Sequence, residues 1–419
     1  MRTFRNLTIE DLDQYMPIYL HAYPAYKTLD EEGRSHYRNR IKKDMTLDTD
    51  VDFIGLFEED EMIALMKVIH FSMNVYGKMQ KATGLMSLAV HPLHKKKKAA
   101  FEMVQYYEKY SQEKGANIFA LLPFNINFYR QMGYGLGSKI DEYHIPTNNL
   151  PKSNLQANLI FITNKERILQ AYNEKAEKIH GMFKKFDEEK RALLEDQETL
   201  HIAYVKDNKI SSYASYHFES THPENYTQTR IVVDELIYDS AQELRELLEY
   251  FRRQADLAQS ILIRTSEEDF YHLLQDPQDL SLHYIPYGYL QTNVSAMANM
   301  YKIHDFTKFV QDTSYRKFPY TNLVIALEAY NEITKETEKI KIEFTGHHGQ
   351  GYSHWSPSDK EAQVKISAKK GDLSSLLLNS IRFSSLIGLG LGTIDKEEYI
   401  DQIDRLLYYP QKPFSNNDY

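Results

Sequence analysis

The sequence predicts an α+β protein made of three successive units, and three observations support this prediction. Apolar runs alternate with amphipathic helical segments over residues 1–148, the same order of elements recurs over 149–290, and shorter β-rich runs followed by two helices occupy 291–419. We therefore expect a mixed sheet flanked by helices in each of the first two units. The third unit is expected to be a small α+β domain with an extended tail.

Composition excludes several classes of protein. A chain of 419 residues with 42% hydrophobic residues can form real cores, and its net charge of −9 argues against a nucleic-acid binder, which needs a basic face. The absence of cysteine excludes disulfides, thiolate nucleophiles and cysteine-based zinc sites, and it favours a cytoplasmic location. The first residues do not form an apolar signal peptide, and no run approaches about 20 apolar residues, so no membrane partner is expected.

The first unit begins with a helix and continues as a sheet. Thr8 is a typical N-cap, and apolar residues at helical spacing follow it to about Tyr26. An acidic turn at 58–61 separates two β-rich runs and predicts a hairpin. Strands are expected at 51–57, 62–71, 84–90 and 117–122, with a helix at about 99–114.

The second unit repeats this outline after a turn-rich linker that starts at residue 149. Charged helical segments fill 165–198, and a hairpin centred on Asp207 and Asn208 follows them. The remaining elements of this unit are a strand at 231–238, a helix at about 241–256 and a strand at 260–264. In the third unit, strands are expected at 322–330, 339–344 and 362–367, and helices at 373–381 and about 396–408.

The segment from Leu88 to Ala100 carries the clearest chemical signal. A central strand ends near Pro92, and a helix begins a few residues later, after four consecutive lysines. A helix start presents unpaired N–H groups and about half a positive charge, so this strand–loop–helix suits a pyrophosphate. Small side chains at Ala99 and Ala100 would let the backbone approach the phosphates. The alternative is that the lysines form a solvated helix start, as most runs of charge do.

This pattern, together with FYRQMGYG at 128–135, resembles the GNAT acetyltransferase superfamily. The pyrophosphate loop of that family reads Arg/Gln-x-x-Gly-x-Gly/Ala, and the corresponding residues here are Lys95, Lys98 and Ala100, so that Lys98 replaces the usual glycine. Across nearly the whole chain, the organisation resembles the Eis-like (enhanced intracellular survival) acetyltransferases. In that group a working acetyltransferase domain is followed by a degenerate one and by a sterol-carrier-protein-like domain.

The resemblance implies acetyl-CoA as the co-substrate and indicates which residues would hold it. Residues of the central strand would pair with the pantetheine, the lysine loop would surround the pyrophosphate, and two residues after the next strand would lie nearby. The residues implied are Leu88, Ala89, Val90, Lys95, Lys96, Lys97, Lys98, Ala99, Ala100, Phe101, Phe124 and Asn125. The backbone N–H near Val90 is the expected oxyanion donor.

The resemblance also implies two catalytic residues. Tyr129 matches the tyrosine that acts as general acid, since a phenol of pKa about 10 can donate a proton or a hydrogen bond to the departing thiolate. The α-carboxylate of Tyr419 matches the terminal group that acts as base, and Asp418 would attract a cationic amine. The alternatives are a structural role for Tyr129, one of 32 tyrosines, and an inert, frayed chain end.

Other motifs carry no expected chemistry. The acidic, N-capped helix start that follows Asp239 would repel a pyrophosphate, so no CoA is expected in the second unit. The histidine-rich stretch 346–354 is expected to form a hairpin loop, and no metal is expected in the protein. The apolar helix at 373–381 is expected to belong to a packed core more than to a lipid cavity.

Three functions remain open at this point. The favoured one is direct acetyl transfer from acetyl-CoA to a primary amine, either on a small cationic molecule such as an aminoglycoside or on a lysine side chain. A second is a non-catalytic CoA- or ligand-binding regulatory protein of the same fold, and a third is the transfer of another acyl group. By resemblance, the chain would form a homo-oligomer, namely a hexamer.

Overall fold

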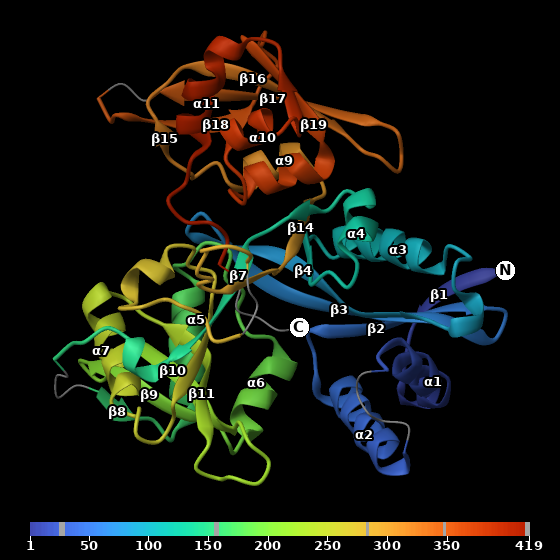
Figure 1. The fold of residues 1–419 in the computed structure, drawn as a ribbon. Helices are drawn as coiled ribbons and strands as arrows, with labels where there is room; N and C mark the ends of the chain where they lie inside the picture. Colours follow the sequence, from blue (N-terminus) through green and yellow to red (C-terminus); the bar gives the residue numbers. More distant parts are fainter. Residues whose placement is uncertain (25–29, 155–158, 282–284, 347–348, 415–419) are drawn as a thin grey trace.

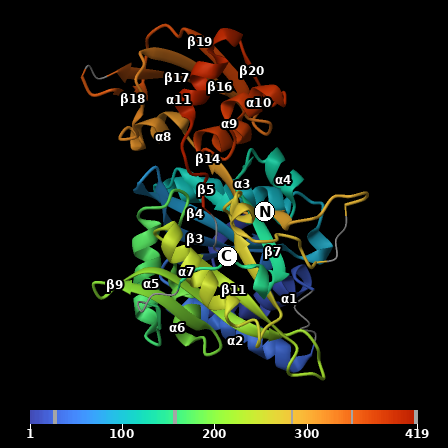
Figure 2. The ribbon, with the colours of Figure 1, turned by 60° about the vertical axis from the view of Figure 1, so that its left-hand side comes forward.

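Each of the three units in the computed structural model is built around its own β-sheet (Figure 1), so the expected α+β class is confirmed. In Figures 1 and 2 the third unit lies above the other two, and Figure 1 shows the first two units side by side. The structure describes residues 1–24, 30–154, 159–281, 285–346 and 349–414. Within these ranges, no helix combines the length and the apolar character needed to cross a membrane.

The first sheet has seven strands, in the order β1-β2-β3-β4-β5-β14-β6. Strands β4 and β5 run parallel, and the other neighbours in this sheet run antiparallel. The bounds of these strands, in sheet order, are Arg2–Asn6, Val51–Glu58, Glu61–Val75, Lys78–Val90, Ile118–Leu121, Met300–Ile303 and Gly135–Leu136.

Helices cover both faces of the first sheet. Buried residues of α1 (Leu12–Ala22) pack in one apolar cluster, and those of α3 (Ala99–Glu113) pack in another on the opposite face. Thr8 caps a short 3-10 turn with a capping box, so the helix expected from Thr8 to Tyr26 is divided, and its α-helical part ends at Ala22. The remaining helices are α2 (Glu31–Leu47), which no sequence pattern had indicated, and α4 (Ile126–Gln131).

The second sheet also has seven strands, in the order β13-β7-β12-β11-β10-β9-β8. In sheet order, their bounds are Val294–Met297, Lys139–Pro146, Ser260–Thr265, Thr229–Ile237, Lys209–Ser220, Leu200–Lys206 and Leu159–Phe161. The helices of this unit are α5 (Lys165–Ala176), α6 (Asp187–Glu195) and α7 (Ala241–Arg252). Strands β11 and β12 run parallel, as β4 and β5 do, so the repeated outline seen in the sequence is a repeated fold.

Strands from distant parts of the chain complete both sheets. Strand β7 precedes the boundary expected at residue 148, yet it pairs with β12 and β13 in the second sheet. Strand β14 follows the boundary expected at residue 290 and lies between β5 and β6 in the first sheet. Buried Lys302 on β14 binds Glu108 of α3 and the Met132 carbonyl, which fixes this inserted strand to the helices of the first unit.

The third unit contains a six-stranded sheet, in the order β15-β18-β17-β16-β19-β20. In sheet order, its strands are Phe318–Pro319, Tyr352–Pro357, Thr337–Gly346, Leu323–Tyr330, Val364–Lys369 and Gly392–Ile394, and its helices are α8 (Phe306–Asp312), α9 (Lys370–Leu377), α10 (Phe383–Gly388) and α11 (Ile400–Leu407). Gly135 packs directly on α9, because a Cβ atom at this position would lie 2.0 Å from the Gly371 carbonyl oxygen. Close packing of the first and third units therefore depends on this glycine.

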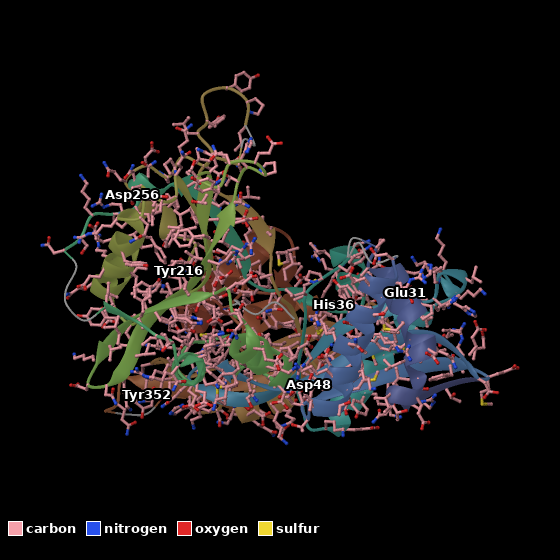
Figure 3. The ribbon with its side chains drawn as sticks, turned by 90° about the horizontal axis from the view of Figure 1, so that it is seen from below. Glu31, His36, Asp48, Tyr216, Asp256 and Tyr352 are labelled. Carbon is pink, nitrogen blue, oxygen red and sulfur yellow. The ribbon has the colours of Figure 1, made fainter. Side chains whose placement is uncertain are left out.

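Charged residues join the first unit to the second. Lys67 Nζ on β3 lies 3.0 Å from carboxylate oxygens of Asp44 on α2 and Glu188 on α6. Arg40 binds Glu188 at 2.7 Å, and Arg191 of α6 binds Asp44 and Asp48. In Figure 3, Asp48 lies where the first unit meets the second. We call Arg40, Asp44, Asp48, Lys67, Glu188 and Arg191 the charge network; its three cations balance its three carboxylates.

The segment after α11 passes between the three units. Asn379 donates to the carbonyls of Tyr409 and Gln411, and the Phe414 N–H donates to the His180 carbonyl at 2.8 Å. His180 is fully buried: its Nδ1 accepts from the Tyr76 N–H, and its Nε2 donates to the Leu378 carbonyl. This pattern requires a neutral imidazole. Burial, together with the nearby guanidinium of Arg316, lowers the pKa of His180 to about 4.

This buried histidine predicts a dependence of stability on pH. Between about pH 6.5 and pH 4 the unfolded chain binds a proton at His180 that the folded protein does not, so the free energy of unfolding decreases as the pH falls through this window. The loss amounts to at most about 3 kcal/mol. Urea unfolding at several pH values should therefore show a smaller decrease for His180→Gln than for the natural protein. His217→Gln, at a half-exposed position, is the control; equal slopes for all three proteins would contradict the assignment.

Candidate active site

The parallel pairing of β4 with β5 stops before β4 ends. The last paired residues are Leu85 and Leu121, whereas β4 continues to Val90. A bulge starts just beyond this point, where Ser87 and Leu88 lie opposite the single residue Met66, and Ser87 adopts a left-handed φ of 53°. The residues of β4 after Leu85 therefore have a strand neighbour on the β3 side only.

Because β4 and β5 separate after Leu85, backbone groups of β4 become available for pairing with a ligand. The His91 N–H donates to the Ile63 carbonyl of β3 at 2.9 Å. Because successive N–H groups of a strand point to opposite sides, the Val90 N–H points away from β3, into the gap beside β4. The residue expected to supply the oxyanion donor thus has an N–H that faces the gap.

The start of α3 has no side-chain cap. Its N-cap is Lys98, in the left-handed region (φ 65°), and the Lys98 side chain makes no capping hydrogen bond to the first N–H groups of the helix. Left-handed backbone favours glycine, which is the residue usual at this position in the resembling family, so Lys98 keeps the backbone shape while adding a side chain. Arg2 binds Glu102 at 2.8 Å and so offsets the negative charge in the first turn. These features leave a helix start that suits an anion.

A hollow of about 400 Å³ lies between the gap and this helix start, and we call it the loop hollow. Ten of the twelve residues expected around the cofactor line it: Leu88, Ala89, Val90, Lys95, Lys96, Lys98, Ala99, Ala100, Phe101 and Phe124. The other two, Lys97 and Asn125, do not. The Lys97 carbonyl accepts from Arg2, and the Asn125 side chain caps α4 by accepting from the Phe128 N–H.

A second hollow, of about 320 Å³, adjoins the first, since both are lined by Tyr23, Leu88 and Phe124. We call it the tyrosine hollow. Its other lining residues are Tyr19, Arg40, Lys67, Leu85, Met86, Ser87, Leu122, Pro123, Tyr129 and Met297. A small molecule that entered through this hollow would meet the bulged part of β4.

Tyr129 lies on the buried face of α4, and it lines the tyrosine hollow. Its hydroxyl has no hydrogen-bond partner among the residues that the structure describes. Burial raises the pKa of Tyr129 to about 12, so the phenol stays protonated throughout the physiological range. Full proton transfer to a thiolate whose acid has a pKa of about 8.5 would therefore be uphill, which favours Tyr129 as a hydrogen-bond donor.

The sequence had not singled out the charged residues of the tyrosine hollow. Lys67 is 2% exposed, and it interrupts the apolar run 62–71, so a lone cation in a predicted buried strand was the available signal. Although burial opposes its charge, the cations Lys67 and Arg40 lower the pKa of Glu188, which keeps this carboxylate ionised. Two cations of the charge network, Arg40 and Lys67, therefore line the tyrosine hollow.

Tyr419 and Asp418, the expected base and the expected amine-binding residue, lie outside the described residues. The last described residue is Phe414, whose backbone is held by His180. Their roles stay predictions.

The second unit repeats the geometry of the strands but not the helix start. The pairing of β11 with β12 stops at Val233 and Ile263, and β11 has its own one-residue bulge at Asp234. At the start of α7, however, the Ser240 side chain accepts from the Glu243 N–H, and Lys175 pairs with Asp239. The hollow beside this strand end is lined in part by the segment from Tyr408 to Lys412. A cap and a peptide segment thus lie where the first unit has an open helix start.

Comparison with known families identifies both repeated units. Residues 3–137 match a family model described as an acetyltransferase (GNAT) domain, and residues 180–297 match a second model with the same description. These matches confirm the expected tandem of two such folds. Comparison with curated proteins finds no match.

Solved structures share the whole architecture at low identity. Eis1 from Mycobacterium abscessus is 15% identical, with 100% of both chains covered and a TM-score of 0.75. A GCN5-related N-acetyltransferase from Anabaena variabilis is 14% identical, with 99% of this chain and 98% of that chain covered and a TM-score of 0.77. A probable N-acyltransferase of unknown function from Enterococcus faecalis has the same identity and coverage, and a TM-score of 0.78. At these identities the likeness shows a common fold.

Proposed function

Since the chain is an acyltransferase that carries two acetyltransferase (GNAT) domains in tandem, we propose that its first domain transfers an acetyl group from acetyl-CoA directly to a primary amine. The observation that carries this proposal is the joining of two features: the gap beside β4 and the uncapped start of α3 border one hollow. Acetyl-CoA has an anionic pyrophosphate and an amide-bearing arm, and each would meet the matching part of this hollow. The chain has no cysteine, which supports transfer without a thioester intermediate on the enzyme.

The proposed mechanism assigns a task to each group near the gap. The N–H groups at the start of α3 and the lysine loop hold the pyrophosphate, and the Val90 N–H stabilises the oxyanion that forms when the amine attacks. Tyr129 donates a hydrogen bond to the departing sulfur. The α-carboxylate of Tyr419 removes the proton that the ammonium must lose, directly or through water. Acetyl-CoA supplies the activated acyl group.

The acceptor we propose is an amine on a small cationic molecule, aminoglycoside-like, or on a lysine side chain. Rings of Tyr19 and Tyr23 line the tyrosine hollow, and aromatic faces attract cations. Lys67 and Arg40 would repel a cation if they were alone, but the carboxylates of the charge network balance them. The net charge of −9 favours the approach of cations in general.

Other expectations from the resemblance remain proposals. The third unit would be a sterol-carrier-like domain that directs the tail toward the first domain, and the chain would act as a hexamer in the cytoplasm. The domain boundaries at 148 and 290 and the absence of a catalytic metal stay predictions.

Thermal unfolding with acyl-CoA ligands tests the proposed function. Acetyl-CoA should raise the Tm of the natural protein, and the Tm should not respond in Ala100→Glu, because the new carboxylate would lie at the open helix start. The matched control is Ala241→Glu, at the capped start of α7, which should keep the full response. A response to no CoA ester would favour the non-catalytic alternative, and a response to myristoyl-CoA alone would favour transfer of another acyl group.

Replacing Tyr129 tests its role in turnover. Tyr129→Phe should lower kcat roughly 100-fold while leaving the KM for acetyl-CoA within about twofold, since the hydroxyl acts on the leaving sulfur and not on the bound nucleotide. Release of free thiol with a panel of amines, aminoglycosides included, provides the measurement. Tyr134→Phe, which changes a neighbouring buried ring, is the control. Unchanged kcat in Tyr129→Phe would remove the assigned role.

Extending the chain tests the terminal carboxylate. A few residues added after Tyr419 should abolish transfer without changing the Tm shift that acetyl-CoA produces, because the α-carboxylate is displaced while the loop hollow is intact. The same residues added before Met1 serve as the control. Full activity of the C-terminally extended protein would show that another group acts as the base.

A further inference from the structure

A cluster of metal-ligand side chains lies beside the lysine loop; one of them, His94, also lines the loop hollow, and the proposed mechanism gives none of them a task. His91 and His94 stand at the two ends of the 3-10 turn Pro92–His94, and Glu61 stands at the start of β3, after the acidic turn. One ligand atom from each of the three residues lies within 4.8 Å of the others. The sequence had favoured no metal after weighing the histidine-rich stretch 346–354, which is a different part of the chain.

A carboxylate lies near each ring nitrogen of His94, which is the arrangement that a metal-bound histidine needs. Its Nε2 lies 3.9 Å from a Glu61 oxygen, and its Nδ1 lies 3.6 Å from a Glu58 oxygen. Histidines that bind a metal through one nitrogen usually donate the other N–H to a carboxylate, which fixes the ring. Glu58 stands in that supporting position, and Glu61 stands on the side of the metal.

The same ring carries an unsatisfied atom. The His94 side chain is 13% exposed, and its Nδ1 is buried without a hydrogen bond, because the contact with Glu58 is too long to count as one. Coordination at Nε2 would pull the ring and Glu61 together and would bring Nδ1 into line with Glu58. Among the residues that the structure describes, the His91 ring accepts one weak hydrogen bond, from the Leu93 N–H to Nδ1 at 3.3 Å, and water can replace His91 as the acceptor at this partly exposed turn.

We propose that His91, His94 and Glu61 bind one Zn²⁺ ion, with Glu58 as the outer partner of His94. Two imidazoles and a carboxylate are a known zinc ligand set, and water completes the tetrahedron. Zn–N and Zn–O bonds of about 2.0–2.1 Å place ligand atoms about 3.4 Å apart, so the three side chains need to close by about 1 Å or a little more. Exposed Glu61 has the freedom to do so, since its side chain is 63% exposed.

Such an ion would fix the loop that follows it. The three ligands belong to two elements: the turn that leads into the lysine loop, and the hairpin of β2 and β3. A shared ion would tie the turn to the hairpin and would hold Lys95, four residues after His91, in one position beside the loop hollow. The proposal does not depend on acetyl transfer, because it concerns the cation alone.

Titration of the chelator-treated full-length protein with ZnCl2 tests the site. Calorimetry should detect one Zn²⁺ per chain for the natural protein, His91→Ala and His94→Ala should each weaken binding at least tenfold, and Glu61→Gln should weaken it by a smaller factor. The control is His217→Ala, a histidine beside Asp234 in the second unit, which should bind zinc as the natural protein does. Circular dichroism verifies that each variant is folded.

Cobalt(II) provides a second measurement that does not depend on the variants. In place of zinc, it should give the visible absorption of a tetrahedral nitrogen–oxygen site, and ZnCl2 should abolish this absorption. Equal zinc binding by the natural protein and His94→Ala would overturn the proposal, and so would a cobalt spectrum typical of a hydrated octahedral ion.

Discussion

The early end of the pairing between β4 and β5 is the constraint on which the candidate site depends. Two parallel strands that stay paired to their ends leave no main-chain group free, whereas here β4 continues five residues beyond Leu85 without β5 beside it. The bulge at Ser87 and Leu88 turns the strand, and the Val90 N–H then faces open space. Both hollows border this one stretch of unpaired backbone, and Tyr129 approaches it from α4.

Comparison of the two repeated units shows which features of the candidate site come from the strands and which come from the helix start. Both sheets have a parallel pair that parts early, and both have a bulge of one extra residue on the longer strand. The helix starts differ: the Ser240 side chain accepts from an N–H group of α7, whereas the Lys98 side chain makes no such hydrogen bond at the start of α3. The segment from Tyr408 to Lys412 also lines the hollow of the second unit. The proposed anion site therefore depends on the helix start and its surroundings more than on the strands, which both units share.

Much of the first two folds could be predicted from periodicity, because the central strands are apolar runs and α3 has a clear amphipathic face. Strands β1 and β7, with the sequences RTFRN and KIDEYHIP, carry no such run and were not predicted. Helix α2 was missed because its mean hydropathy is low and only Ile41 and Asp44 are fully buried, so no apolar stripe marks it. The loop hollow could be predicted because most of the residues that line it lie close together in the sequence, between Leu88 and Phe101. The sequence could not predict the positions of Arg40, Glu188 and Met297, since these residues belong to segments far apart in the chain that come together only in the folded protein.

The exchange of strands between the sheets has a consequence for synthesis. The first sheet lacks an interior strand until Met300–Ile303 emerges from the ribosome, although the rest of its strands end at Leu136. More than 160 residues are translated between the end of β6 and the end of β14. Until then, β5 and β6 each have an unpaired edge, and such edges favour association with other chains. If the chain were divided between the first two units, the N-terminal piece would lack β14 and the C-terminal piece would lack β7. Because β7 and β14 are exchanged between the two sheets, we expect the first two units to complete their folding together.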